Sequence, residues 1–220
     1  MKLKDAAKAC ALVYNEHEFD VDGVQWNASV VGNRLSIVIA GTNSPKEHLS
    51  NAQAIQRWSI LVPRVQVHRK FENDAAVIVD TMSSVYDFRN YKLWIMGHSR
   101  GGAVAQILAA YVASIQRFGD FSAPHIVSFE SPRAGDWRLR RFMRKHIEHH
   151  TRVVRAGDPV PLMPLWPHYW HDRPPLYIDN DGSIGKMPLW RRILAFPIHM
   201  SLETHDMNTI VELIPEGYDI

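Results

Sequence analysis

The fold of this chain is decided by the stretch Gly97-His98-Ser99-Arg100-Gly101-Gly102. It has the form G-x-S-x-G and lies between the apolar segment Lys92 to Met96, which indicates a strand, and the apolar segment Ala103 to Ile115, which indicates a buried helix. A chain that turns so tightly from strand to helix needs glycine on both sides of the serine, because Cβ atoms there would collide with neighbouring backbone. The strained turn projects the hydroxyl of Ser99 away from the sheet. The pattern therefore predicts a nucleophilic serine.

The chemistry of a serine nucleophile requires two further parts. A helix that begins directly behind Ser99 brings its unpaired N-terminal amides to the place where an oxyanion forms, and the amide of Arg100 is the natural first donor. The hydroxyl also needs a base that an acid holds in place, and in this kind of site the chain order is serine, acid, histidine. Four histidines lie far enough along the chain to qualify: His168, His171, His199 and His205.

The favoured acid is Asp158. It follows directly after a predicted strand, Arg152 to Ala156, on the turn-forming sequence Gly-Asp-Pro, so its carboxylate is expected at the same sheet edge as the serine. An Asx-type turn without a catalytic role is the alternative for this residue. Asp172 and Asp179 are weaker candidates for the acid.

The favoured base is His205. It directly precedes a periodic apolar run, residues 210–214, which predicts a final helix docked on the core. A docked helix holds an imidazole in one position, whereas His199 lies in an apolar stretch that follows a proline, where a capping or covering role is expected.

Strands and helices alternate through the middle of the chain. We expect an opening helix to about Tyr14, a helix from about Glu72 to Phe88, and strands at Val24 to Val31, Leu35 to Ala40, His125 to Phe129 and Arg152 to Ala156. The first two of these strands are joined at Gly32-Asn33, a hairpin signal. The order predicts an α/β fold with a mixed, mostly parallel sheet and helices on both faces, and 220 residues suit a single domain spanning residues 1–220.

Composition excludes several classes of protein. The net charge of +2 is too small to indicate a nucleic-acid partner. Five basic residues gather in one predicted helix, and a solvated face is a better interpretation of them than contact with phosphates or an anionic membrane; they are Arg138, Arg140, Arg141, Arg144 and Lys145. No segment has about 20 uninterrupted apolar residues, so we expect no transmembrane helix. With one cysteine, Cys10, and no signal-peptide pattern, we expect a cytoplasmic location, with release by another route left open.

Several motifs together resemble the class 3 lipases, the family of the fungal triacylglycerol lipases. Residues 97–102 match the G-H-S-x-G-G of that family, and residues 131–136, Ser-Pro-Arg-Ala-Gly-Asp, are similar to its S-P-R-x-G-[DN]. Residues 152–154 and 158–164 resemble its R-V-V and D-x-V-P-x-L-P. The resemblance covers most of the chain from Ala40 onward and implies an α/β-hydrolase fold.

The resemblance also implies the roles of individual residues. It makes Asp158 the acid of a Ser-His-Asp triad, makes His205 the histidine that opens the last helix, and makes Thr42, after Gly41, the second oxyanion donor. It implies an acyl-enzyme mechanism on carboxylic esters, with lipid acyl esters favoured, that needs no cofactor and no metal. Phospholipase A1, small-ester carboxylesterase and acyltransferase use the same residues, and a non-catalytic binding protein on this fold is the alternative from another class. The oligomeric state is not predicted.

Two features concern the surroundings of the site. The family usually has Gly where this chain has Glu130 and Arg where it has Ala40, so local loop geometry is expected to differ. We expect residues 44–62 to form a lid whose apolar face, with Trp58, Ile60 and Leu61, makes transient contact with a lipid surface; a plain surface loop is the alternative. Trp166, Trp170, Trp190 and Phe196 are expected to line an acyl pocket or to pack in the core.

Overall fold

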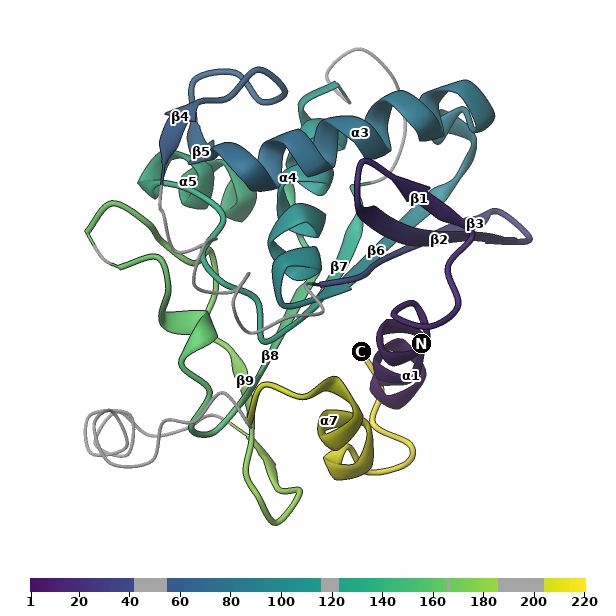
Figure 1. Ribbon diagram of the computed structural model, residues 1–220, viewed down its shortest axis with the longest axis vertical. Helices are drawn as coiled ribbons and strands as arrows, with labels where there is room; N and C mark the ends of the chain where they lie inside the picture. Colours follow the sequence, from purple (N-terminus) through teal and green to yellow (C-terminus); the bar gives the residue numbers. More distant parts are fainter. Residues whose placement is uncertain (42–54, 116–122, 166, 186–203) are drawn as a thin grey trace.

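The centre of the molecule is a twisted eight-stranded sheet (Figure 1). In this computed structural model, residues 1–41, 55–115, 123–165, 167–185 and 204–220 are described. The strands, in spatial order, are β1 (Phe19–Val21), β2 (Val24–Val31), β3 (Arg34–Ile39), β6 (Lys92–His98), β7 (His125–Phe129), β8 (His150–Arg155), β9 (Leu176–Ile178) and β10 (Ile184–Gly185). The four pairings from β3 to β9 are parallel and those at the two margins are antiparallel. The predicted mixed, mostly parallel sheet is confirmed.

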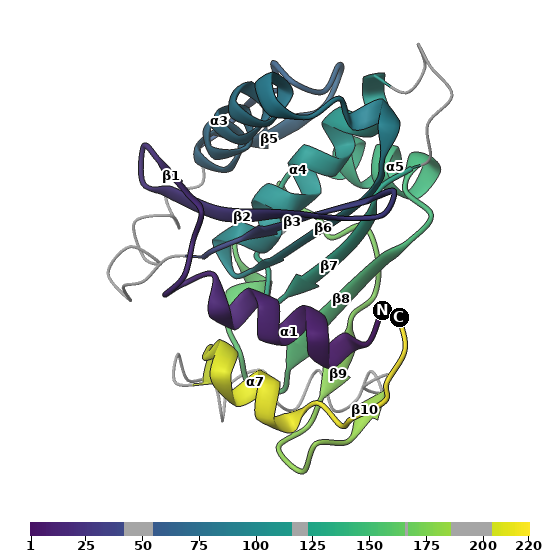
Figure 2. The ribbon, with the colours of Figure 1, turned by 90° about the vertical axis from the view of Figure 1, so that its right-hand side faces the viewer.

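Helices cover both faces of the sheet (Figure 2). One face carries α1 (Leu3–Leu12) and α7 (Met207–Leu213), and the other carries α3 (Arg69–Val85), α4 (Arg100–Ile115) and α5 (Trp137–His146). Each face of the sheet has its own hydrophobic core, because successive side chains of a strand point to opposite faces. Leu35 and Ile37 of β3 pack with α3 and α4, while Val38 packs with α1 and α7. Both cores are therefore built on one sheet. None of the helices in the described ranges is long and apolar enough to cross a membrane.

The observed elements differ from the expected ones mainly at their ends. The β2–β3 hairpin turns at the predicted position, with Gly32 at φ +60°. The strand β6 continues two residues beyond the expected end at Met96, because His98 still pairs with Phe129 of β7. The helix α3 begins at Arg69 and ends at Val85, before the short 3-10 helix Phe88–Asn90. The strand that brings Ser99 into position is therefore longer than the apolar pattern indicated.

A separate two-stranded hairpin, β4 (Gln56–Trp58) and β5 (Gln66–His68), packs beside α3 and α5. The buried carboxylate of Glu72, on α3, anchors it by accepting hydrogen bonds from Ser59 Oγ and from the Ile60 amide, the latter at 2.9 Å, and by pairing with Arg57 Nε at 2.6 Å. We therefore do not assign residues 57–62 to a mobile lid. Residues 44–54 of the predicted lid lie outside the described residues.

The basic residues of α5 partly cover aromatic rings. Arg138 lies 5.2 Å from the ring centroid of Trp58 and 4.9 Å from that of Trp137, and Arg140 lies 5.1 Å from that of Trp170. The predicted helix is confirmed, and its arginines form cation–π pairs as well as a solvated face. Trp170 thus lies against Arg140, while the other predicted pocket aromatics, Trp166, Trp190 and Phe196, lie outside the described residues.

Candidate active site

Ser99 occupies the sharp turn between β6 and α4. Its backbone has φ +54°, a left-handed conformation that costs free energy for a residue with a Cβ atom, and its side chain is buried. The flanking glycines are required by space: a Cβ atom on Gly97 would lie 2.7 Å from the Gly102 amide nitrogen, and one on Gly101 would lie 2.7 Å from the Ala40 carbonyl oxygen. Within the described part of the chain, Ser99 Oγ has no hydrogen-bond partner. The turn thus fixes the position of the Ser99 hydroxyl, and no hydrogen bond within the described residues occupies it.

The N-terminus of α4 begins one residue after Ser99. The Ser99 carbonyl accepts the first helical hydrogen bond, from the Gly102 amide at 3.0 Å, so the amide of Arg100 belongs to the unpaired first turn. The Arg100 side chain turns away, toward Asp74 at 3.6 Å and the Gly23 carbonyl at 3.1 Å. The backbone of Gly41 approaches from the other side, since a Cβ atom there would lie 3.0 Å from Ser99 Cβ. Thr42 lies outside the described residues.

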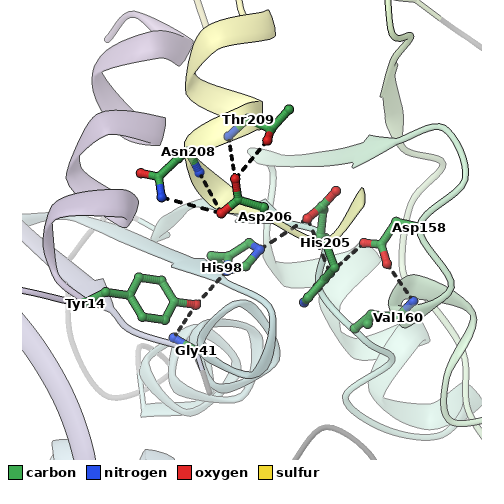
Figure 3. A network of polar contacts seen from close by, with 10 residues as sticks. Tyr14, Gly41, His98, Asp158, Val160, His205, Asp206, Asn208 and Thr209 are labelled. Carbon is green, nitrogen blue, oxygen red and sulfur yellow. Dashed lines mark hydrogen bonds and ion pairs between the residues drawn. The ribbon is translucent and has the colours of Figure 1, made fainter. Parts of the chain in front are cut away.

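The structure brings Asp158 and His205 together across 47 residues of sequence. His205 Nδ1 lies 2.8 Å from Asp158 Oδ2, and both side chains are buried (Figure 3). The other carboxylate oxygen accepts a hydrogen bond from the Val160 amide at 2.8 Å, which fixes the orientation of the acid. Asp206 caps α7 by accepting hydrogen bonds from the amides of the next turn, so the helix start holds His205 in place. The final helix does dock as its apolar period predicted.

A second buried histidine, His98, lies next to His205. The two imidazole centroids are 4.7 Å apart, and Figure 3 shows His98 between Tyr14 and His205. The hydroxyl of Tyr14 lies 2.6 Å from His98 Nδ1 and accepts a hydrogen bond from the Gly41 amide at 3.1 Å. A polar chain therefore runs from His205 through His98 and Tyr14 to the loop at Gly41.

Glu130 completes this buried group. Its Oε2 lies 3.2 Å from His98 Nε2 and 3.3 Å from His205 Nδ1. Burial, the negative charge of the adjacent Asp158 and a hydrogen bond with that carboxylate raise the pKa of Glu130 well above its usual value, against an opposing contribution from Arg155. This residue was not placed in the site from the sequence; its one signal was the departure from the glycine that the family resemblance led us to expect there.

The weaker candidates make other contacts. Asp172 pairs with His150 Nδ1 at 2.9 Å, and Asp179 belongs to the turn before β10, where its carbonyl accepts a hydrogen bond from Gly182. His171 Nε2 lies 2.6 Å from the Pro161 carbonyl, and its pKa is held well below the usual value by burial and by the charge of Arg152. His168 is exposed, and His199 lies outside the described residues. The 2.8 Å contact between Asp158 and His205 joins one acid and one histidine of the candidates.

Comparison with known proteins identifies a family. Residues 36–168, more than half of the chain, match the family model described as "Lipase (class 3)". This chain belongs to the class 3 lipase family. The matched residues of this class 3 lipase contain the Ser99 turn and Asp158, and they end before His205.

Related sequences and structures extend the similarity over the class 3 lipase chain. A secreted mono- and diacylglycerol lipase of Fusarium solani is 27% identical over 83% of this chain and 57% of its own length. A lipase of Caenorhabditis elegans is 26% identical over 70% of this chain and 43% of its own length. The chain spans about half the length of these curated relatives. The solved lipase of Rhizopus microsporus var. chinensis shares the fold, with a TM-score of 0.66 at 17% identity over 92% of this chain and 84% of its own.

The relatives correct one expectation about this class 3 lipase. The proteins from Fusarium solani and Penicillium camembertii are named as secreted lipases. The expectation of a cytoplasmic location, drawn from the lack of a signal-peptide pattern, is therefore wrong, and the relatives point to an extracellular location.

Proposed function

We propose that this chain hydrolyses carboxylic esters through Ser99, His205 and Asp158, as one catalytic domain spanning residues 1–220. The observation that carries the proposal is the 2.8 Å contact between His205 Nδ1 and Asp158, at the sheet edge where Ser99 heads a buried helix. This combination of a strained serine, a helix N-terminus and an oriented imidazole is the arrangement that acyl transfer requires.

Each residue has one role in the proposed reaction. His205 Nε2 removes the proton of Ser99 Oγ as the oxygen attacks the ester carbonyl, and it later gives the proton to the leaving alcohol. Asp158 holds the tautomer in which Nδ1 carries the proton, and it stabilises the imidazolium as that forms. The amides of Arg100 and Thr42 donate to the oxyanion. In the second half of the reaction, His205 removes a proton from water as the water oxygen attacks the acyl-enzyme carbonyl. His205 then gives that proton to Ser99 Oγ as the acid leaves.

We propose lipid acyl esters as the substrate class. The Fusarium and Penicillium relatives are named mono- and diacylglycerol lipases, and the anchored hairpin of this chain exposes two large apolar side chains, Trp58 and Ile60, at 57% and 74%. Exposed apolar groups of this kind gain free energy at a lipid surface, because lipid removes them from water. Transient contact with lipid through the hairpin is therefore part of the proposal.

The first experiment is labelling with a fluorophosphonate probe. Only a serine activated by a base reacts with such a probe at a useful rate, so the parent protein is expected to be labelled at Ser99. The variant Ser99→Ala is the matched control and is expected to remain unlabelled. A parent protein that is folded but unlabelled would support a non-catalytic binding protein on this fold.

The second experiment concerns substrate. Each methylene buried in an apolar pocket contributes about 0.8 kcal/mol, so p-nitrophenyl esters of medium or long acids are expected to exceed the acetate in kcat/KM. The variant Trp58→Ser is expected to narrow that difference for substrate presented at an interface. An enzyme fastest on acetate would be a small-ester carboxylesterase, and hydrolysis confined to phospholipid acyl chains would make it a phospholipase A1.

A further inference from the structure

Two residues with left-handed backbone stand side by side at the catalytic edge of the sheet. Ser99 follows β6 with φ +54°, and Glu130 follows the neighbouring strand β7 with φ +49°. They are tied to the same register, because the Ser99 amide donates to the Phe129 carbonyl at 2.9 Å and the Glu130 amide donates to the Val153 carbonyl at 2.8 Å. Backbone strain in a residue with a Cβ atom is retained where the side chain is needed in that position. The left-handed backbone at Ser99 directs the nucleophilic hydroxyl away from the sheet. The left-handed backbone at Glu130 must have another cause, because Glu130 is not a nucleophile.

The side chain of Glu130 is fully buried and is aimed at the histidines of the site. One carboxyl oxygen, Oε2, is within 3.3 Å of both His98 Nε2 and His205 Nδ1. Burial of a carboxyl group is costly unless hydrogen bonds compensate, and His98 Nε2 and the Asp158 carboxylate supply them.

The protons of the network can be followed from one end. Burial raises the pKa of Tyr14, so its hydroxyl stays protonated. Since the Tyr14 oxygen accepts from the Gly41 amide, its own proton is directed to His98 Nδ1, and the neutral His98 ring then donates from Nε2 to Glu130. His205 Nδ1 donates to Asp158 at 2.8 Å and faces Glu130 at the longer distance of 3.3 Å. Glu130 thereby joins the histidine base to the Gly41 loop.

The charge of Glu130 matters as much as its place. An ionised carboxylate beside His205, added to that of Asp158, would stabilise the imidazolium and remove the free base. The surroundings prevent this, because burial and then the charge and hydrogen bond of Asp158 raise the pKa of Glu130, against the opposing charge of Arg155. A neutral carboxyl in this position holds the imidazole without adding a second negative charge.

We propose that Glu130 is a positioning residue for the catalytic reaction, which holds His205 and His98 through one carboxyl oxygen and so couples the base to the loop that leads into the oxyanion donor. This proposal rests on the proposed function of Ser99 and His205. It assigns Glu130 no contact with substrate.

The test compares Glu130→Gly with Glu130→Gln. Glycine accepts the positive φ without strain, so Glu130→Gly is expected to fold while it loses both contacts. Displacing a catalytic group by about 1 Å can cost about 10²-fold, so kcat and the rate of fluorophosphonate labelling are expected to fall about 10- to 100-fold, with KM within about threefold of the parent. Glutamine keeps the shape and neutrality of the group and is expected to restore both rates to within about threefold. Asp172→Asn, at a buried carboxylate paired with His150, is the control for general destabilisation and is expected to leave kcat per folded molecule unchanged.

The pH profile separates positioning from a merely structural role. The acid limb of kcat/KM reports the free-enzyme base, and it is expected at the same pH in the parent and in Glu130→Gln, since neither adds a charge. A shift of that limb in Glu130→Gln by about one unit to lower pH would show that the carboxylate is ionised and would overturn the proposal. Parental kcat in Glu130→Gly would overturn it as well. So would loss of parental activity on dialysis against EDTA, because His98, Glu130 and His205 would then be acting as metal ligands.

Failure of this proposal is distinguishable from failure of the proposed function. An unlabelled parent protein would remove the catalytic role of Ser99, whereas a labelled parent with an equally labelled Glu130→Gly variant would remove only the role of Glu130. The NMR resonance of the His205 Nδ1 proton adds a readout that needs no turnover. Faster exchange of that proton with water is expected in Glu130→Gly and not in Glu130→Gln, and equal exchange in all three proteins would contradict the proposal.

Discussion

The described part of the chain brings together two sets of serine, histidine and aspartate that invite comparison. In the first, Asp158 holds His205 beside the Ser99 turn. In the second, Ser128 Oγ lies 2.9 Å from His150 Nε2, and His150 Nδ1 lies 2.9 Å from Asp172 Oδ2. All three side chains of the second set are buried. Judged by contacts alone, the second set is the more complete one.

The surroundings decide between the two sets. Ser128 lies inside β7, in ordinary strand geometry, and its hydroxyl is already paired with His150. Ser99 lies at a strained turn, and the amides of α4 begin behind it. A nucleophile needs an oxyanion site and a hydroxyl free to attack, whereas a buried hydrogen-bonded set satisfies polar groups and stabilises the sheet. Hydrogen bonds among a serine, a histidine and an aspartate are therefore not sufficient to define a catalytic site.

The largest expected difference concerns the two serines. Ser99→Ala is expected to lower ester hydrolysis by about 10³-fold or more, the usual loss for a triad nucleophile, with the fold unchanged. Ser128→Ala is expected to keep kcat within a few-fold. Rates on p-nitrophenyl esters, normalised to folded protein by circular dichroism, give the measurement. Residual activity of Ser99→Ala within tenfold of the parent would remove Ser99 from its role.

The two histidines are expected to differ in kind. His205→Gln removes the base and should abolish most of kcat. It should lower the free energy of unfolding less than His150→Gln, because it takes a partner from Asp158, which keeps its hydrogen bond from the Val160 amide. His150→Gln leaves Ser128 and Asp172 buried without their shared partner, and unpaired buried polar groups cost about 1–3 kcal/mol each, so the free energy of unfolding should fall by that order. Urea unfolding and kcat are measured on both variants, with His199→Gln as the comparison for His205. Near-parental kcat in His205→Gln, together with its loss in His199→Gln, would reverse the assignment of the base.

The smallest expected effect is a dependence of stability on pH through Asp172. Despite its burial, the nearby His150 lowers the pKa of Asp172 below its usual value, so folding favours the ionised form. The stabilisation is present above about pH 4, the ordinary carboxyl pKa, and is lost as the pH falls from there toward the lower pKa of the folded protein. Urea unfolding at pH 7 and pH 3.5 is expected to show Asp172→Asn less stable than the parent, by a margin that narrows at the lower pH. A margin that widens on acidification would contradict the stated direction.

Asp158→Asn is the matched control for that experiment. It alters the acid that orients His205, so kcat is expected to fall through the wrong imidazole tautomer, by no more than in Ser99→Ala. Asp172→Asn should retain kcat per folded molecule. Equal kinetic losses in the two variants would mean that the second set also supports the reaction.

The sequence by itself determined the features that depend on neighbouring residues. The Gly-x-Ser-x-Gly turn, the β2–β3 hairpin and the apolar helix behind Ser99 all arise within a few residues, since local collisions and side-chain periodicity are properties of short segments. The choice of Asp158 followed from its place directly after a strand. Strand ends were less exact, as at His98, because pairing with β7 extends β6 beyond its apolar pattern.

Tertiary structure decided the contacts between side chains that lie far apart in the chain. Glu130 could not be connected with His98 and His205 from sequence, because the strand register and a positive φ together place one oxygen between two rings. Nor did the sequence distinguish the set of Ser128, His150 and Asp172, whose spacing resembles a triad out of the expected order. The physical reason is that a hydrogen bond depends on positions within a few tenths of an ångström, and in this fold those positions are set by the packing of three adjacent strands and the helix α7.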